Sequence, residues 1–311
     1  MSNSPIDGNY HDRLRQEGEI WGKVAEAMAA QDAPDWQVQR QALHNLIVHA
    51  RHVDAMLEAV QPGMQALDLG CGAGELTVAL ARRGAHVLGI DISARALEVA
   101  RGYYASVQSQ LVGTASYEQA DLNTLSLPTA RYDRIVIKGA LHHLVDLPHL
   151  VGQMRQALRP DGLLWVQDSH GDESRAGVLM ASVLMFVLPT HVSYGDKVRG
   201  LLRFGLRAPS RIKLSMEAEG LSPFEGAGRD QDWLALIQQA FDVIDLERGG
   251  TVTGYLAHQL RLPRSLALPL LRLIYGLERL LLRLGLLRSS GVVLLARSRP
   301  RELVEAQSVT S

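Results

Sequence analysis

A glycine-rich turn that follows Asp68 has the residue types and spacing of a ligand-binding loop. Its glycines follow a G-x-G-x-G pattern, at Gly70, Gly72 and Gly74. The apolar run 64–69 comes just before the turn, so we expect a strand to end here and a helix to begin near Gly74. Glycine tolerates positive φ and lets the backbone approach a ligand closely. The turn therefore predicts a crevice for a nucleotide-like ligand at the carboxyl ends of the strands; a glycine turn that only tightens such a core is the alternative.

Two carboxylates follow the next two expected strands and extend this crevice. Asp91 ends the run 86–90, and Asp121 follows the run 115–120. A carboxylate at the first position can accept two hydrogen bonds from a ribose diol, and a carboxylate at the second can accept from the exocyclic amine of adenine. Each acid precedes an apolar residue that could cover the adenine ring: Ile92 and Leu122. The spacing predicts a ligand that contains adenosine.

Short apolar runs and helical segments alternate around this loop. Strands are expected at 64–69, 86–90, 115–120, 132–137 and 161–167, and later at 241–247 and 291–298. Helices are expected at 74–83, 93–104 and 146–158, after two N-terminal helices at 10–31 and 36–60. Strands that alternate with helices of this length indicate βαβ units and a parallel sheet.

Five successive segments resemble the motifs of class I S-adenosylmethionine (SAM) dependent methyltransferases: LDLGCGAGELTVALARRG, VLGIDIS, QADL, YDRIVIKGALHHLVD and LRPDGLLWVQD. The resemblance covers about residues 40–170 and two closing strands, and it is to the small-molecule branch with an LHHL run. It implies a Rossmann-like, mostly parallel seven-stranded sheet whose last strand is antiparallel, with N-terminal helices and a helical cap. It also implies SAM as cofactor, with Asp68 and the glycines at its methionine part, Asp91 at the ribose and Asp121 at the adenine.

Two histidines, His142 and His143, follow the fourth strand, whose carboxyl end faces the donor methyl group in this fold. A histidine could remove a proton from an oxygen acceptor, and consecutive residues point in different directions, so at most one should face it. The alternative is that the pair shapes the pocket, since the family carries LHHL runs with different acceptor chemistries. Lys138 is expected to contribute backbone to the SAM pocket. Asp168 and His170, past the fifth strand, are candidate acceptor contacts.

The first helix is dense in groups that could close over a ligand. In related enzymes an N-terminal helix covers the cofactor, so Tyr10, His11 and Trp21 are candidate lid residues. An amphipathic helix with a solvated charged face is the alternative. Cys71 is expected to be a small residue that fills the glycine loop beside the cofactor, because no base neighbours it in the sequence.

Composition excludes several classes of protein. The net charge is −1 and the pI about 6.8, which argues against a dedicated nucleic-acid binder. A single cysteine rules out an internal disulfide and suits the cytoplasm. No secretory signal opens the chain, and the longest apolar run, Val178–Leu188, is far shorter than the ~20 residues of a spanning helix. Lys138-Gly139 stand where metal-assisted methyltransferases carry carboxylates, so no metal site is expected.

The expected divisions are an N-terminal helical lid (1–60), a SAM-binding core (61–169), a helical acceptor-site insert (170–235), closing strands with a second helical insert (236–299, insert 255–288) and a tail (300–311). The first insert carries a basic stretch, 196–213. In the second, Arg272, Arg279 and Arg283 share one helix face, with leucines filling much of the rest. This region can be a buried helix pair that extends the core with arginines at its rim, a lid that contacts an anionic membrane, or a surface that joins two copies of the chain.

The sequence thus predicts an enzyme that methylates oxygen or carbon of a small or lipid-like acceptor. The alternatives are a methyltransferase that acts on protein or RNA and a non-catalytic SAM-binding protein. Nucleic-acid amino-methylating enzymes carry an N/D-P-P-Y/F run after the fourth strand and protein arginine enzymes carry paired glutamates, whereas this chain has Lys-Gly-Ala-Leu-His-His. We expect a cytoplasmic protein without a nucleic-acid partner, with peripheral binding to the inner membrane face as an alternative.

Overall fold

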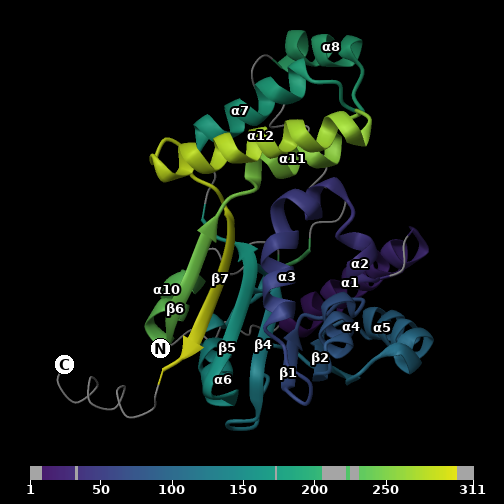
Figure 1. Cartoon of the computed structure of the whole chain (residues 1–311), viewed down its shortest axis with the longest axis vertical. Coiled ribbons are helices and arrows are strands. Elements are labelled where there is room, and N and C mark those ends of the chain that lie inside the picture. Colours follow the sequence, from purple (N-terminus) through teal and green to yellow (C-terminus); the bar gives the residue numbers. More distant parts are fainter. Residues whose placement is uncertain (1–8, 32–33, 172–173, 205–221, 225–230, 300–311) are drawn as a thin grey trace, which may run out of the picture.

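The computed structural model describes residues 9–31, 34–171, 174–204, 222–224 and 231–299. Its centre is a seven-stranded sheet of order β3-β2-β1-β4-β5-β7-β6 (Figure 1). β7 is antiparallel to both of its neighbours, whereas the pairs among β1 to β5 are parallel. The strands are β1 (Gln65–Leu69), β2 (His86–Asp91), β3 (Thr114–Gln119), β4 (Tyr132–Lys138), β5 (Leu158–Ser169), β6 (Phe241–Arg248) and β7 (Gly291–Ser298). This confirms the predicted fold class, a Rossmann-like sheet whose last strand is antiparallel.

Helices cover both faces of the sheet because its central strands are apolar on both sides. Leu67 and its neighbours on one face pack against α6 and α10, while Ala66 and its neighbours on the other pack against α3 and α4. α5 lies beside β2 and β3. These helices are α3 (Ala50–Glu58), α4 (Glu75–Arg82), α5 (Ala94–Val107), α6 (Leu147–Ala157) and α10 (Trp233–Ala240). The parallel strands end along one edge, where the residues that follow them lie close together.

The prediction of one helix over 36–60 is wrong. The segment contains α2 (Trp36–Gln39), a π-helical turn η1 (Asn45–His49) and then α3. The π-turn aligns residues five apart, and the Nε2 atoms of His44 and His49 lie 2.7 Å from each other. A hydrophobic pattern cannot predict such a turn, because it departs from the α-helical period.

The helical insert expected over 255–288 consists of two helices, α11 (Thr251–Gln259) and α12 (Arg264–Arg283), separated by residues 260–263. Pro263 stands at the N-cap of α12 with φ of −52° and ψ of 140°, so its backbone is extended rather than helical. The chain therefore reverses here, and an antiparallel bridge joins Leu260 to Thr190.

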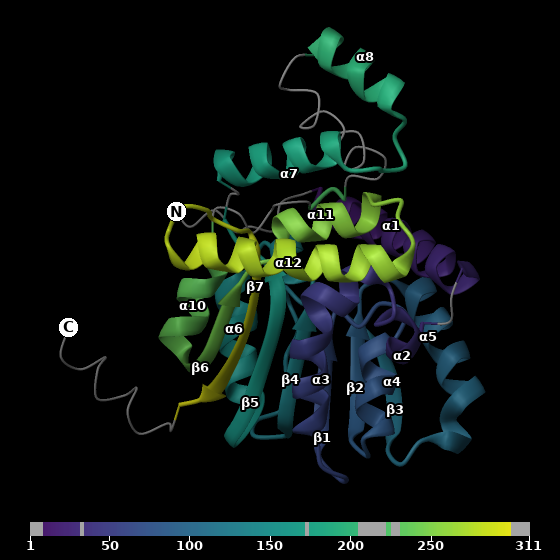
Figure 2. The ribbon, with the colours of Figure 1, turned by 45° about the horizontal axis from the view of Figure 1, so that its top comes forward.

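Four helices gather beyond the carboxyl edge of the parallel strands, as Figures 1 and 2 show. They are α7 (Arg175–Val187), α8 (Tyr194–Phe204), α11 and α12, and we call them the cap. The cap has a small apolar core of its own, in which Ala181 meets Leu256 and Leu271. A further helix, α1 (Tyr10–Gln31), lies against α5.

The predicted tail, 300–311, lies outside the described residues, as does the part of the basic stretch beyond Phe204. Among the helices that the structure describes, none is both long and apolar enough to cross a membrane.

Candidate active site

The glycine loop turns sharply at the end of β1. Gly70, Gly72 and Gly74 have φ of 72°, 51° and 83°, a region that favours glycine. The amides of Gly70 and Cys71 donate to the carbonyl of Ile90, at 2.8 and 3.0 Å. A side chain at Gly74 would lie 2.7 Å from the Tyr117 hydroxyl, whereas a Cβ at Gly72 would enter open space. The loop is thus held tightly on its inner side and leaves room on the other for a ligand.

Asp68 and Asp91 end neighbouring strands beside this loop and have different partners. Asp68 is buried and accepts a 2.6 Å hydrogen bond from Thr77 Oγ1, and burial raises its pKa to about 7. Asp91 accepts from the amides of Gly72 and Ser93, at 2.9 and 2.8 Å. Burial raises the pKa of Asp91, and these amide donors act in the opposite direction.

Asp121 joins the core to the N-terminal helix. Its Oδ2 accepts from the Tyr10 hydroxyl at 2.7 Å, and Asn123 donates to the same hydroxyl at 2.8 Å. Burial, and then the bond to Asp121, raises the pKa of Tyr10. Further along α1, Ser93 Oγ donates to the carbonyl of Gly18 at 2.5 Å. Polar contacts therefore hold α1 across the ends of β2 and β3.

A cavity of about 840 Å³ runs from the glycine loop to the cap. Nine of the ten residues predicted for the cofactor line it: Asp68, Gly70, Cys71, Gly72, Asp91, Ile92, Asp121, Leu122 and Lys138. The tenth, Gly74, caps α4 behind the loop. The open space at Gly72, the carboxylate of Asp91 and the size of the cavity fit an adenosine-bearing cofactor. Burial raises the pKa of the Cys71 thiol, so it is a packing group rather than a thiolate at neutral pH.

The two histidines of the LHHL run have different surroundings. His142 Nδ1 lies 2.5 Å from Asp168 Oδ1, and the other oxygen of Asp168 accepts from the amide of Leu141 at 2.7 Å. His143 is buried, with Nδ1 at 3.1 Å from Ser222 Oγ and 3.3 Å from Glu17 Oε1. Both line the cavity, but only His142 is paired with a carboxylate from the sheet.

The structure places some of the remaining predicted residues in the cavity wall and others outside it. Trp21 lines the cavity and meets His143 edge to face, with ring centroids 5.3 Å apart. Tyr10 is buried behind the wall, and His11 is exposed beside it. His170 turns away from the cavity toward α10, where its Nε2 lies 2.7 Å from Asp232.

The side of the cavity nearest the cap is lined by residues that the sequence did not single out. We call His44, His49 and His258 the histidine wall. The His44 ring stacks on His258 with centroids 4.3 Å apart, and burial lowers the pKa of His44 to about 4, of His49 to about 2, and also that of His258. The wall is therefore uncharged at neutral pH. Because these residues come from η1 and α11, no spacing in the sequence could have brought them together.

Gln167 of β5 completes this wall. Its Nε2 lies 3.5 Å from His49 Nε2, which is also 2.7 Å from His44 Nε2. If both groups donate to it, His49 carries its proton on Nδ1. Among the described residues of this wall, His44 Nδ1, His49 Nδ1 and Gln167 Oε1 are buried without a hydrogen-bond partner. With these tautomers the cavity holds one unused donor, on His49, and two unused acceptors, on His44 and Gln167.

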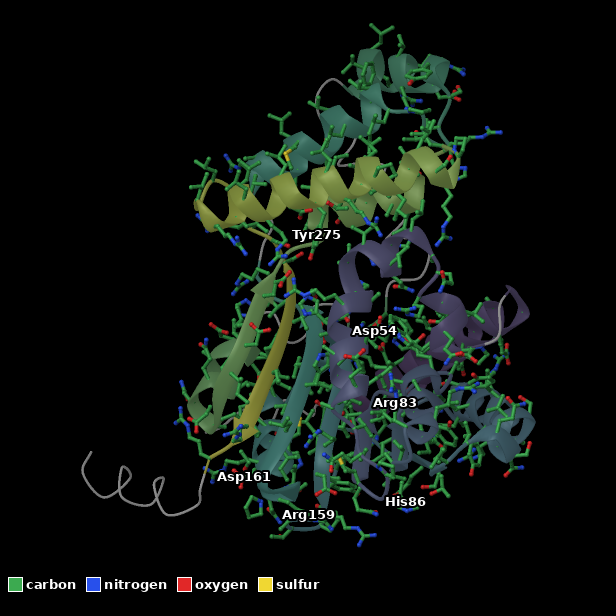
Figure 3. The ribbon with its side chains drawn as sticks, in the orientation of Figure 1. Asp54, Arg83, His86, Arg159, Asp161 and Tyr275 are labelled. Carbon is green, nitrogen blue, oxygen red and sulfur yellow. The ribbon has the colours of Figure 1, made fainter. Side chains whose placement is uncertain are left out.

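Two further charged groups of the cavity wall, Lys138 and Glu247, are in ion pairs. Lys138 forms an ion pair with Glu75. Glu247 accepts from Tyr275 at 3.1 Å and lies 3.2 Å from Arg279; Tyr275 projects from α12 toward the sheet (Figure 3). The hydrogen bond from His52 lowers the pKa of Glu247 to about 2. Within the described part of the chain, no group of three or more His, Cys, Asp or Glu is arranged to hold a metal ion.

Comparison with known proteins agrees with this geometry. Residues 66–162 match the family described as a methyltransferase domain. An uncharacterized methyltransferase of Mycobacterium tuberculosis is 37% identical over 117 residues, which are 37% of this chain and 56% of that protein. A ubiquinone biosynthesis O-methyltransferase of Leptothrix cholodnii is 34% identical over 121 residues, 39% of this chain and 50% of that protein. The chain thus matches only about half the length of these relatives.

The fold has a solved counterpart. A chain of the complex between the Haloferax volcanii Trm112 methyltransferase activator and a methyltransferase superposes with a TM-score of 0.51 at 15% identity, covering 89% of this chain and 98% of that one. This likeness concerns the fold alone. The family match over residues 66–162, with the glycine loop, its acids and the sheet order, identifies the core of this chain as a class I SAM-dependent methyltransferase domain with SAM as its cofactor.

Proposed function

We propose that this protein transfers the methyl group of SAM to a hydroxyl oxygen of a small or amphipathic acceptor, with His142 as general base. The observation that carries the proposal is the pairing of His142 Nδ1 with Asp168 at 2.5 Å in the cavity wall. His142 follows β4 and Asp168 lies at the carboxyl end of β5, and both line the same cavity as the glycine loop and the histidine wall.

Methyl transfer to a hydroxyl group requires that donor and acceptor are correctly positioned and that one proton is removed. When bound, SAM supplies a methyl group already activated by a positive sulfur. Asp68, Asp91 and Asp121 would hold the methionine, ribose and adenine parts respectively. Asp168 accepts from Nδ1–H of His142, which fixes the tautomer and leaves Nε2 to take the hydroxyl proton of the acceptor. The carboxylate then stabilises the imidazolium that forms.

The uncharged histidine wall supports a neutral acceptor. A hydroxyl group can donate to Gln167 Oε1, and a hydroxyl or carbonyl oxygen can accept from His49 Nδ1, which would satisfy two of the three buried atoms without partners in this wall. Apolar residues beside them, such as Val293 and Leu144, suit a ring or an aliphatic body. The name of the Leptothrix relative, an O-methyltransferase, agrees with an oxygen acceptor.

Methyl-labelled SAM and a panel of phenols and long-chain alcohols test the proposal. We expect a labelled product from at least one class, and His142→Ala should lower kcat by about 10²–10⁴-fold while SAM affinity, measured by calorimetry, stays unchanged. His170→Ala is the matched control, because His170 also pairs with an aspartate but lies outside the cavity wall.

Two outcomes would contradict this function. Full activity of His142→Ala would remove the general base, and label that appears only in added protein or RNA would assign the enzyme to a macromolecular acceptor.

A further inference from the structure

One face of α12 is both apolar and exposed. Five leucines on it are between 49% and 72% exposed, and we call them the leucine stripe: Leu266, Leu273, Leu277, Leu280 and Leu284. Their spacings of seven, four, three and four place them in a sector roughly 60° wide at 3.6 residues per turn. The buried positions of the helix, such as Leu271 and Ile274, lie roughly 90–150° round the helix from the stripe. The stripe is therefore a second apolar face, which the cap core does not use.

The other helices of the cap lie at the same end of the molecule (Figure 2), and two of them carry exposed apolar side chains. On α7 these are Leu179, Val183, Phe186 and Val187, and on α8 they are Val198, Leu201 and Leu202. Isolated exposed apolar residues are common, but groups of this size on several helices of one cap indicate an interaction surface.

The charge of the cap indicates the partner. Its described residues 174–204 and 251–288 contain ten Lys or Arg and two acids, although the whole chain has a net charge of −1. Of the two acids, Glu278 is buried, and Asp196 is paired with Arg199. Arg272 and Arg283 are exposed about 100–120° round α12 from the leucine stripe. Arg279 faces inward to Glu247 instead.

We propose that the outer face of the cap binds the surface of an anionic lipid bilayer. An amphipathic helix with an apolar stripe flanked by arginines lies in the plane of the lipid headgroups, with the stripe among the acyl chains. A second copy of this chain would fit the same stripe less well, because it would bring two strongly basic surfaces together. α12 also contributes Tyr275 to the cavity wall, so one helix would contact lipid and cavity on different faces.

Co-sedimentation with vesicles tests this proposal on the full chain. We expect binding to vesicles of phosphatidylcholine with 30% phosphatidylglycerol at low salt, and much weaker binding to phosphatidylcholine alone or at high salt. Arg272→Ala with Arg283→Ala should lower the partition coefficient roughly 25-fold, since each basic residue near such a surface contributes about fivefold. Leu273→Glu should lower it by about tenfold or more.

Val112→Glu is the matched control, because Val112 is 72% exposed, like Leu273, but lies in the loop before β3. It should bind vesicles like the unchanged protein. No binding to anionic vesicles at low salt, or equal binding by Leu273→Glu, would overturn the proposal. A dimer in lipid-free solution that Leu273→Glu dissociates, measured by light scattering, would assign the stripe to self-association instead.

The outcome of the vesicle-binding test does not depend on which methyl acceptor the enzyme uses. SAM affinity of Leu273→Glu should equal that of the unchanged protein, because the side chain is 72% exposed and lies outside the cavity wall. Loss of vesicle binding with SAM affinity intact would therefore concern this surface alone, and would leave the proposed methyl transfer untouched.

Discussion

The carboxyl group of Asp68 lies in an environment that disfavours its ionised form. Its side chain is buried beneath the glycine loop, and burial raises its pKa to about 7. In the ligand-free protein this carboxyl lowers stability as pH rises from about 4 to 7, because the folded state binds its proton more tightly than the unfolded chain does. A positively charged ligand beside it reverses that preference, since it favours the ionised form.

SAM affinity should consequently rise between pH 6 and pH 8, by up to about tenfold per pH unit below the pKa. Asp68→Asn should remove this slope and weaken binding at pH 8. Thr77→Val should move the midpoint to higher pH, because the Thr77 hydroxyl donates to the ionised carboxylate. Calorimetric titrations at three pH values measure all of these effects, and an equal slope in Asp68→Asn would show that another group titrates.

Single residues also show what the sequence could and could not predict. The glycine loop and its acids were recognisable because they are adjacent to strands, and their positions follow from local sequence. The different surroundings of His142 and His143 depend on Asp168, 25 or more residues away, and on Ser222, which no local pattern connects to them. The partner of His49 comes from β5 and that of His44 from α11, so the histidine wall exists only in the folded chain.

At the scale of elements, α11 depends on a side chain from α12. Gly250 precedes α11 and cannot cap it with a side chain. Instead the buried carboxylate of Glu278 accepts from the amides of Val252 and Thr253, at 3.1 and 3.0 Å, and from the Thr253 hydroxyl at 2.6 Å. A carboxylate at a helix N-terminus satisfies donors that would otherwise be unpaired and interacts favourably with the helix dipole.

Glu278→Ala should therefore destabilise the protein by about 2–4 kcal/mol, since it leaves buried donors without a partner. Glu278→Gln should cost about half as much, because one amide oxygen can still accept. Glu58→Ala, at an exposed helix position, should change stability by less than about 0.5 kcal/mol. Urea denaturation measures the three free energies, and a Glu278→Ala value close to that of Glu58→Ala would contradict this role.

Elements were predicted best where one physical signal governs them. The seven strands were expected within three residues of their observed starts and within two of their observed ends, because buried apolar runs between helices mark them clearly. The single helix expected over 36–60 is the exception, because a π-turn separates α2 from α3 although α3 packs on the sheet. The helical insert over 255–288 is likewise interrupted, at Pro263, whose backbone is extended. Both interruptions are decided by local backbone geometry.

Across the whole molecule, the cavity is closed by parts of the chain that are far apart in sequence. The core strands form its floor, the cap forms one side, and α1 lies across the cofactor end. α1 has few buried positions, namely Tyr10, Glu17, Gly22 and Ala25, and its Val24 and Met28 are partly exposed while they line the cavity. The helix is therefore held mainly by polar contacts such as Tyr10 to Asp121, and we expect it to open more easily than the core.

A bound cofactor would fill the space beneath α1 and give its exposed apolar residues a partner. Hydrogen exchange should then slow by about tenfold or more over α1 and the glycine loop when SAM is present at 100 times its dissociation constant, a condition that supplies about 2.7 kcal/mol of binding energy. Exchange in β6 and β7 should change only through global stability. Tyr10→Phe loses the bonds to Asp121 and Asn123, so α1 should exchange faster in that variant before SAM is added. Protection of the loop without protection of α1 would make the helix a fixed outer wall rather than a cover for the cofactor.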